Sequence, residues 1–426
     1  MIYEDLLVIW LAYLLWEFLP SSLNIQISSF YKVLIFTVKE LLFILTTLSL
    51  RKRKLDRIFV FISFSLFALD ITFFEIKIIL EDYYFSVFLG LFWFLHYYLW
   101  IRLVFYSLNL RYFQIFFAIL LPFFILLFLD ELFQFLNISF PGQFLFLLII
   151  VLIFTPFIIV KIWPVERFPD SPLKEMIFDF LKKSGVKIKQ IYILPSIGPK
   201  FYTAGLVGFI YPFRYLFFSK GLLEILTPEE ILGVLAHEIG HLKRKHGFYL
   251  FLLLLTFPIF ILNSMSLLLY VLVFLFSVSN IDIKDFSEFL KGPYGIYFEI
   301  FLAFWLFFFA FLFLRILFAY FLRSFEREAD LFGLKLLKTP RPLVTALYKI
   351  GELTGQLYHK SWHHYGLWER ILYLQYASEN SLEIESHTLR IRKRLILWVF
   401  LNLILLVLLN FLDLEILKGI LKNLFP

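Results

Sequence analysis

Long apolar segments constrain the fold of this chain more than any other feature of its sequence. A helix that crosses a bilayer needs about 17 to 25 predominantly apolar residues. Of the 426 residues, 61% are hydrophobic, and suitable segments recur along most of the chain. The candidates are residues 5–20, 30–50, 58–76, 84–106, 112–130, 143–162, 248–277, 298–321 and 394–412. We therefore expect a mostly α-helical, polytopic membrane protein with about 7 to 9 transmembrane helices.

The first two candidate segments are the weakest. Residues 5–20 form a short segment, and residues 30–50 carry Lys32, Lys39 and Glu40. Charged side chains are costly in the hydrocarbon region. A position at the membrane surface is therefore the alternative for both segments.

Basic residues set the expected orientation of the chain. The connector RKRKLDR, which begins at Arg51, is the densest basic run, and the positive-inside rule places it in the cytoplasm. Counting segments onward places two polar stretches, residues 163–247 and 322–393, on that same side, where we expect them to form one small α+β domain. The membrane parts are then residues 1–162, 248–321 and 394–426. Whether the membrane is the bacterial inner membrane or the endoplasmic reticulum is left open.

Charge and cysteine content exclude several kinds of site. The formal net charge is +7, but Lys and Arg gather in short connectors and form no continuous basic face, so we expect no nucleic-acid partner. The chain has no cysteine. Any metal ion must therefore be held by histidine and carboxylate side chains.

The first polar stretch carries the signals of a small folded domain. Ser171 begins a predicted helix that ends before Gly185. The runs QIYILP and RYLFFS are predicted strands, and FYTAGLVGFIYP between them is a predicted edge strand. Thr227 and Glu230 form a capping box that begins the next helix.

That helix contains the sequence ILGVLAHEIGHLKRKHG, which begins at Ile231. His237 and His241 are four residues apart, so they share one helix face and can bind the same ion. Glu238 lies to the side, where it can reach a water molecule at the metal. The spacing is that of the H-E-x-x-H zinc-hydrolase motif. The alternative is that these are ordinary polar groups of a buried helix.

A catalytic zinc commonly takes a third protein ligand such as glutamate. The segment RSFEREAD offers Glu326, with Asp330 four residues later on the same helix face. Asp330 would then hydrogen-bond a ligand histidine. Glu328 is about 200° round the helix from Glu326 and is expected to be solvated or ion-paired, like Arg327.

Together these motifs resemble the integral-membrane zinc metallopeptidases of the CAAX prenyl endopeptidase and HtpX family. The order of elements from about Phe168 to Arg370 resembles that family throughout: a helix, IYILPS, a glycine-bearing edge segment, AHEIGH, two membrane helices and the pattern E-x-x-A-D. The resemblance implies one zinc ion per chain in a cytosol-facing zincin-type domain. It implies His237, His241 and Glu326 as ligands, Asp330 beside them, and Glu238 as general base.

Two further sites follow only from the resemblance. In the family, a His-Pro element precedes Glu-Arg and its histidine helps to stabilise the tetrahedral intermediate. The sequence WHHYGLWER offers His364 in that place, followed by Arg370, with His363 as the neighbouring possibility. A surface histidine pair is the alternative, because Tyr365 stands where the family has proline. The edge segment that binds substrate backbone corresponds to four residues, Thr203, Ala204, Gly205 and Gly208.

The expected activity is hydrolysis of peptide bonds in peptides or membrane proteins at the cytosolic membrane face. Quality control of membrane proteins and CAAX-type processing both remain open, and oligomeric state is not predicted. The alternative is a non-catalytic scaffold or transporter with a vestigial motif, in which Asp70 or His96 lines a pathway. We favour hydrogen bonding between helices for these two residues, because neither has a charged partner in register.

Overall fold

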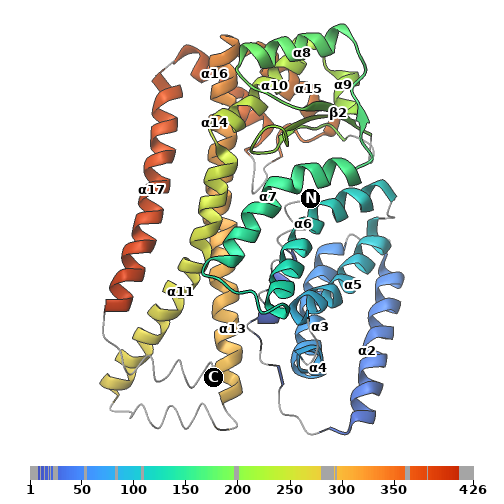
Figure 1. The fold of residues 1–426 in the computed structure, drawn as a ribbon, viewed down its shortest axis with the longest axis vertical. Helices are drawn as coiled ribbons and strands as arrows, with labels where there is room; N and C mark the ends of the chain where they lie inside the picture. The colour runs from blue at the N-terminus through green and yellow to red at the C-terminus, as the bar shows by residue number, and fades with distance from the viewer. Residues whose placement is uncertain are drawn as a thin grey trace. The chain divides into compact units, whose positions relative to one another are not determined.

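The computed structural model describes most of the chain as long helices with one small sheet (Figure 1). Five helices among the described residues are long and apolar enough to cross a membrane. The predicted polytopic, mostly α-helical fold with a small α+β part is thereby confirmed. These helices are Ser29–Leu50, Ser86–Phe105, Gln143–Ile162, His246–Leu272 and Ile300–Leu337. The described residues are 8–9, 11–13, 15–17, 19, 21–22, 27–51, 55–81, 85–106, 110–195, 201–279, 292, 295–359, 365–380 and 382–411.

The chain divides into two compact units, and the first is built mainly from Met1–Leu152 and Phe276–Phe307. Its core joins apolar side chains of several helices, among them Phe67, Phe94 and Trp16. The Trp16 ring lies where a β-carbon on Gly90 would be, so glycine is required at this close approach. The helices of this part are α2 (Ser29–Leu50), α3 (Asp56–Thr72), α4 (Ile76–Glu81), α5 (Ser86–Tyr106) and α6 (Leu110–Phe135). Helices α7 (Gln143–Ile162) and α13 (Gly295–Leu312) begin in the first unit and end in the second.

One predicted segment ends earlier than expected. The apolar segment 58–76 becomes helix α3, which stops at Thr72. Glu75, which follows after a turn, has a positive φ of 58°. The left-handed backbone at this residue separates α3 from the short helix α4.

A buried polar cluster joins α2, α3 and α5. Lys39 of α2 forms an ion pair with Asp70, which is fully buried. The Tyr97 hydroxyl lies 2.6 Å from Asp70 and 2.5 Å from Glu40, and His96 Nε2 lies 3.7 Å from Glu40. The expectation that Asp70 and His96 have no charged partner is therefore wrong. Both partners come from α2, a helix whose pairing the sequence alone does not reveal.

The second unit, built from Ile153–Leu275 and Phe308–Gly419, contains the sheet. The strand order is β1-β2-β4-β3, with β2 and β4 parallel and the other neighbours antiparallel. Strand β3 therefore lies at an edge of the sheet. The strands are β1 (Glu166–Arg167), β2 (Gln190–Leu194), β3 (Ala204–Val207) and β4 (Tyr215–Ser219).

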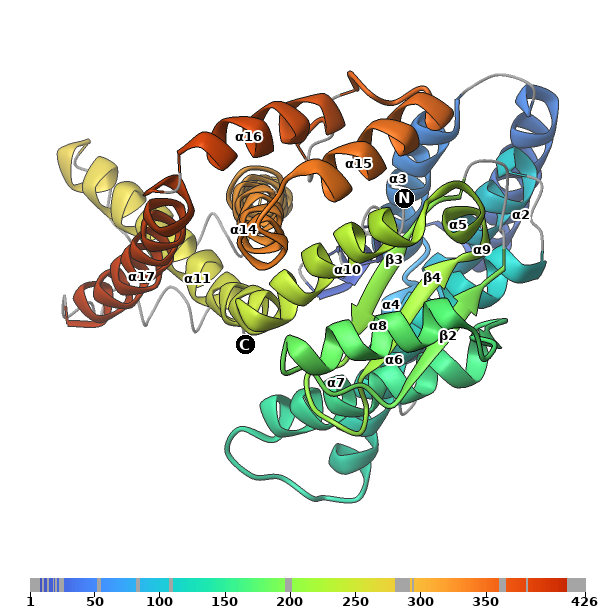
Figure 2. The same cartoon turned by 90° about the horizontal axis from the view of Figure 1, so that it is seen from above.

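Helices α8 (Pro172–Lys183) and α10 (Pro228–Lys243) pack with the strands around one apolar core (Figure 2). The core includes Ile177 of α8, Leu216 and Phe218 of β4, and Leu235 of α10. Strand β4 is buried along its whole length. This packing fixes the position of α10 against the sheet.

Helices α8 and α10 begin where the sequence signals predicted. The Ser171 hydroxyl accepts a hydrogen bond from the Lys174 backbone N–H at 3.3 Å. At the start of α10, Thr227 and Glu230 form the reciprocal capping box, with distances of 2.8 Å and 3.4 Å. An N-cap of this kind stabilises a helix by about 1 kcal/mol.

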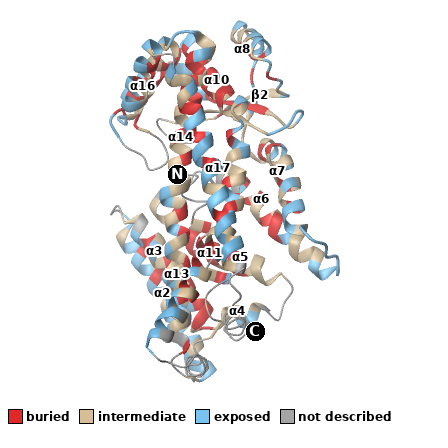
Figure 3. Ribbon diagram, turned by 90° about the vertical axis from the view of Figure 1, so that its left-hand side faces the viewer, coloured by how far each residue is buried: buried red, intermediate tan, exposed pale blue. Residues whose placement is uncertain are grey.

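Helices α14 (Ala319–Leu337) and α15 (Arg341–Thr354) pack directly against α10. Helix α13, a π-helical segment (Phe313–Phe318) and α14 follow one another without a break, so the acidic motif lies on the extension of a membrane helix. Gly240 of α10 lies so close to α14 that an added β-carbon would stand 2.9 Å from the Ala329 backbone. Buried residues are concentrated where these helices meet (Figure 3). The others are α9 (Lys220–Ile225), α11 (His246–Val278), α16 (Leu367–Glu379) and α17 (Leu382–Phe411).

Candidate metal centre

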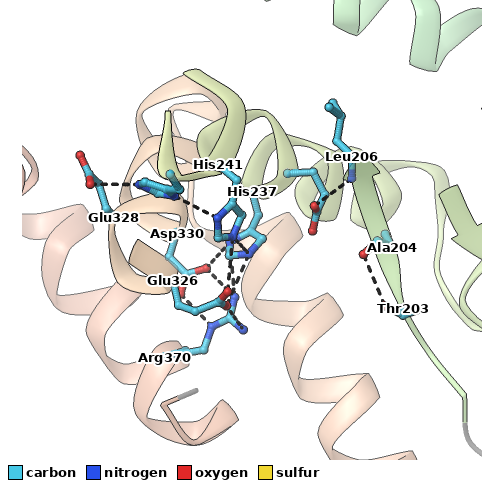
Figure 4. A network of polar contacts seen from close by, with 11 residues as sticks. Thr203, Ala204, Leu206, His237, His241, Glu326, Glu328, Asp330 and Arg370 are labelled. Carbon is cyan, nitrogen blue, oxygen red and sulfur yellow. Dashed lines mark hydrogen bonds and ion pairs between the residues drawn. The ribbon is translucent and has the colours of Figure 1, made fainter. Parts of the chain in front are cut away.

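Three side chains from α10 and α14 converge on one point (Figure 4). His237 Nε2 and His241 Nε2 are 3.1 Å apart. One carboxylate oxygen of Glu326 lies 3.4 Å from His241 Nε2, and the other lies 3.7 Å from His237 Nε2. Among the described residues, this is the group of histidine and carboxylate side chains arranged to hold a metal ion.

The spacing of these atoms fits a tetrahedral zinc ion. Each zinc bond to nitrogen or oxygen is about 2.0–2.1 Å long, so two ligand atoms lie about 3.3 Å apart. The three separations here range around that value. His237 Nδ1 faces the Asp330 carboxylate at 2.8 Å, so that nitrogen carries the proton and Nε2 offers its lone pair to the centre. The donor set therefore fits a divalent cation.

Asp330 and Arg370 form a buried pair behind His237. Arg370 donates two hydrogen bonds to the Asp330 carboxylate, at 2.8 Å from Nε and 2.7 Å from Nη2. Its Nη1 lies 3.5 Å from Glu326. Burial by itself would lower the pKa of Arg370, but the charge of Asp330 raises it above the usual arginine value. The guanidinium thus stays charged and holds two carboxylates of the site in place.

Glu326 also changes the proton affinity of His241. Burial by itself would lower the pKa of His241, but the hydrogen bond and charge of Glu326 raise it above the usual value. A cation, whether a proton or a metal ion, is therefore favoured at this position.

Glu238 follows His237 on α10 and contacts the sheet. Its carboxylate accepts a hydrogen bond from the Leu206 backbone N–H at 3.3 Å (Figure 4). Leu206 belongs to the edge strand β3. The side chain thus faces the open edge of the sheet.

The backbone groups of β3 that point away from β4 can be assigned from the pairing of these two strands. The Ser219 N–H donates to the Thr203 carbonyl at 2.8 Å. The backbone N–H and C=O groups of Thr203 and of every second residue after it therefore point toward β4. Ala204 and Leu206 therefore direct their N–H and C=O groups away from β4. The edge is able to pair with an extended peptide.

The glycines of this segment differ in their surroundings. No other atom lies within 4 Å of a β-carbon built on Gly205, so the strand is open there. Gly208 has a φ of 114°, and an added β-carbon would lie 2.1 Å from the Phe213 carbonyl. Gly208 is thus required by the turn that follows β3.

The second predicted element is only partly described. His363 and His364 lie outside the described residues. Tyr365 is described, and the Arg327 guanidinium lies 3.9 Å from the centre of its ring. Arg327 also pairs with Glu369 at 3.0 Å, while Arg370 reaches the metal centre.

Two residues outside the predicted site extend it, because His246 contacts His241 and Glu328 contacts His246. His246 Nδ1 lies 2.9 Å from His241 Nδ1, and His246 Nε2 lies 3.1 Å from Glu328. Glu328 is ion-paired, as expected for it, but it is also buried. The signal in the sequence was a third histidine five residues after His241.

An apolar cavity of 710 Å³ adjoins the metal centre within the second unit. His241 and the end of β3, Leu206 to Gly208, form one side of it. Phe209 and Phe248 contribute aromatic surface, and Arg214, Lys243 and Lys245 also line the cavity. The cavity offers apolar contact area next to the edge strand.

Comparison with known proteins identifies the family to which these features correspond. Residues 170–387 match the sequence pattern of peptidase family M48. The Protease HtpX homolog of Sulfurovum sp. (strain NBC37-1) is 31% identical over 80 residues, which is 19% of this chain and 28% of that protein. The Plastoglobule-localized metallopeptidase 48 of Arabidopsis thaliana is 31% identical over 80 residues, 19% of this chain and 22% of that protein. The chain thus spans about a quarter of the length of these curated relatives.

A solved structure has a similar fold over most of its length. The crystal structure of Ste24p from S. mikatae aligns with 88% of this chain and 96% of its own, with a TM-score of 0.50 and 16% sequence identity. At this identity the likeness concerns the fold. It extends beyond the matched segment to the membrane helices.

Proposed function

The chain belongs to peptidase family M48, because about half of its length matches that family, and from this premise we propose that it is a zinc-dependent endopeptidase of the membrane. The observation that carries the proposal is the convergence of His237, His241 and Glu326 on one point. His₂Glu is a common ligand set of catalytic zinc. We propose one zinc ion per chain, held by these three side chains.

Zinc, when bound, supplies a Lewis acid that polarises the scissile carbonyl group and lowers the pKa of a water molecule. Glu238 accepts the proton of that water at its carboxylate and delivers it to the leaving amide nitrogen. The support for this role is the position of Glu238 directly after His237 on α10, with its carboxylate in contact with the outward edge of β3.

Asp330 and Arg370 keep the ligands in position. Asp330 accepts a hydrogen bond from His237 Nδ1, which leaves Nε2 free for the metal. Arg370 neutralises Asp330 and lies near Glu326. Its charge offsets part of the negative charge that two carboxylates bring to a buried site.

The substrate is a polypeptide bound in extended form. Its backbone pairs with Ala204 and Leu206 of β3, and its apolar side chains enter the adjoining cavity. Backbone pairing selects little for sequence, so both membrane-protein quality control and CAAX-type processing fit. The scissile bond lies at the cytosolic membrane face in this proposal, because the basic connectors assign the polar stretches 163–247 and 322–393 to that side.

The test uses the Glu238→Gln variant of the full-length protein in detergent or lipid. We expect it to retain zinc and to lose cleavage of an unstructured reporter polypeptide, whereas Glu175→Gln, at an exposed position on α8, leaves both unchanged. A Glu238→Gln variant with wild-type activity would exclude the mechanism. A non-catalytic scaffold predicts no cleavage by any variant. A farnesylated CAAX peptide and its unprenylated control then separate the two substrate classes.

A further inference from the structure

His246 is a buried histidine in direct contact with one of the two histidines of the metal centre. It is 1% exposed, and its ring stacks on Phe325 with centroids 4.6 Å apart. Its Nδ1 faces His241 Nδ1 at 2.9 Å, and its Nε2 faces a carboxylate oxygen of Glu328 at 3.1 Å. His246 therefore bridges His241 and Glu328 through both ring nitrogens.

The turn between α10 and α11 makes this contact possible. On a continuous helix, residues five apart point about 140° away from each other, so His241 and His246 would not meet. Lys245 interrupts the helix with a φ of 59°. This left-handed residue turns the chain, so that His246, the first residue of α11, returns toward His241.

Glu328 reaches His246 from the opposite side of α14. It is offset by about 200° from Glu326, so it faces away from the metal ligands and toward the turn. It is 3% exposed, and Arg244 lies 3.6 Å from its second carboxylate oxygen. The positive charge of Arg244 favours the ionised carboxylate.

The partners of His246 fix the direction of the hydrogen bonds. An ionised carboxylate only accepts, so His246 Nε2 carries a proton and donates to Glu328. A neutral imidazole carries one ring proton, so His246 Nδ1 is an acceptor. His241 must then donate from its own Nδ1. With its proton there, His241 presents the Nε2 lone pair to the point where Glu326 and His237 converge.

We propose that His246 and Glu328 are positioning residues, which hold His241 in the tautomer and orientation that bind the metal. This inference rests on the proposed zinc site and adds a second support to it. Asp330 orients His237 by a direct carboxylate contact, whereas His241 is oriented through an intervening histidine. Partners of this kind, when removed, typically lower metal affinity about 10- to 100-fold.

The experiment compares the zinc affinity of three variants of the full-length protein by competition with a chelator. His246→Phe keeps a ring against Phe325 but removes the acceptor for His241, and we expect affinity to fall about 10- to 100-fold. His246→Gln restores an acceptor for His241 and a donor for Glu328, and we expect this variant to recover part of the lost zinc affinity. The control is His387→Phe, which replaces another buried histidine, bonded to the Ser324 carbonyl, and should leave zinc affinity unchanged.

Cobalt absorption spectra and thermal unfolding separate positioning from general damage. We expect the ligand-field bands of cobalt-loaded His246→Phe to shift, while the metal-free protein unfolds near the wild-type temperature. If His246→Phe does not fold, Glu328→Met is the second variant, and we expect weaker zinc binding from it as well. Wild-type affinity in either folded variant, or an equal loss in His387→Phe, would overturn the inference. A wild-type protein that binds no zinc would instead overturn the proposed function.

Discussion

The carboxylate of Glu238 lies 3.3 Å from the backbone nitrogen of Leu206, so the proposed proton carrier touches the free edge of the sheet. An incoming peptide that pairs with β3 competes for the same N–H group. Substrate pairing and release of the Glu238 carboxylate are therefore coupled in our account.

Replacing Leu206 with proline tests that edge. Leu206→Pro removes an N–H that points away from β4, so the sheet loses no ladder bond. We expect KM for an extended peptide to rise about 2- to 10-fold relative to Leu206→Ala, which also loses the side chain but keeps the N–H. Steady-state kinetics on both variants provide the comparison. Equal KM values would argue against pairing at this residue.

Removing Arg370 tests the buried pair behind His237. Arg370→Leu leaves the Asp330 carboxylate, which is 1% exposed, without its main countercharge. We expect the free energy of unfolding to fall by about 3–5 kcal/mol. Denaturation of the solubilised protein measures this, and the double variant Arg370→Leu, Asp330→Asn should recover part of the loss. A change below about 1 kcal/mol is incompatible with a buried, charged pair.

The raised pKa of His241 predicts the pH dependence of zinc binding. Zinc binds the neutral imidazole, so a proton on His241 must leave first. Since Glu326 raises that pKa, zinc affinity should increase with pH through a midpoint above about 6.5 and then level off. Chelator competition across about pH 5 to 9 gives the profile. A midpoint below 6.5 would show that Glu326 does not act on His241 in this way.

The absence of cysteine allows a direct test of orientation. A single cysteine at the exposed position Glu175 on α8, or at the exposed Asn137 after α6, is the only thiol in each variant. We expect a membrane-impermeant maleimide added outside intact cells to label Asn137→Cys and to spare Glu175→Cys. The reverse pattern would place the metal centre on the outer side.

Local signals predicted the helices of the second unit well. The capping box of Thr227 and Glu230 and the Ser171 cap both act within a few residues, so their effect can be read directly from the sequence. The i, i+4 spacing of His237 and His241 likewise depends only on helix geometry. The prediction that Glu326 is a metal ligand required one further assumption, namely that two segments far apart in the sequence lie close together in the fold.

Contacts that depend on a turn or on helix packing were not predictable. His246 meets His241 only because Lys245 adopts a left-handed conformation, which a lysine rarely does and the sequence does not indicate. Asp70 forms an ion pair with Lys39 because α2 packs beside α3 and α5. The sequences of apolar helices carry little information about which helices will be their neighbours.

Zinc content of the purified protein tests the central claim most directly. We predict about one zinc ion per chain in the wild type and in Glu369→Ala, and a strong loss of zinc in Glu326→Ala. Glu369 is a suitable control because it pairs with Arg327 instead of contributing to the histidine and carboxylate group of the metal centre. A wild-type protein without zinc, or full zinc occupancy in Glu326→Ala, would contradict the account.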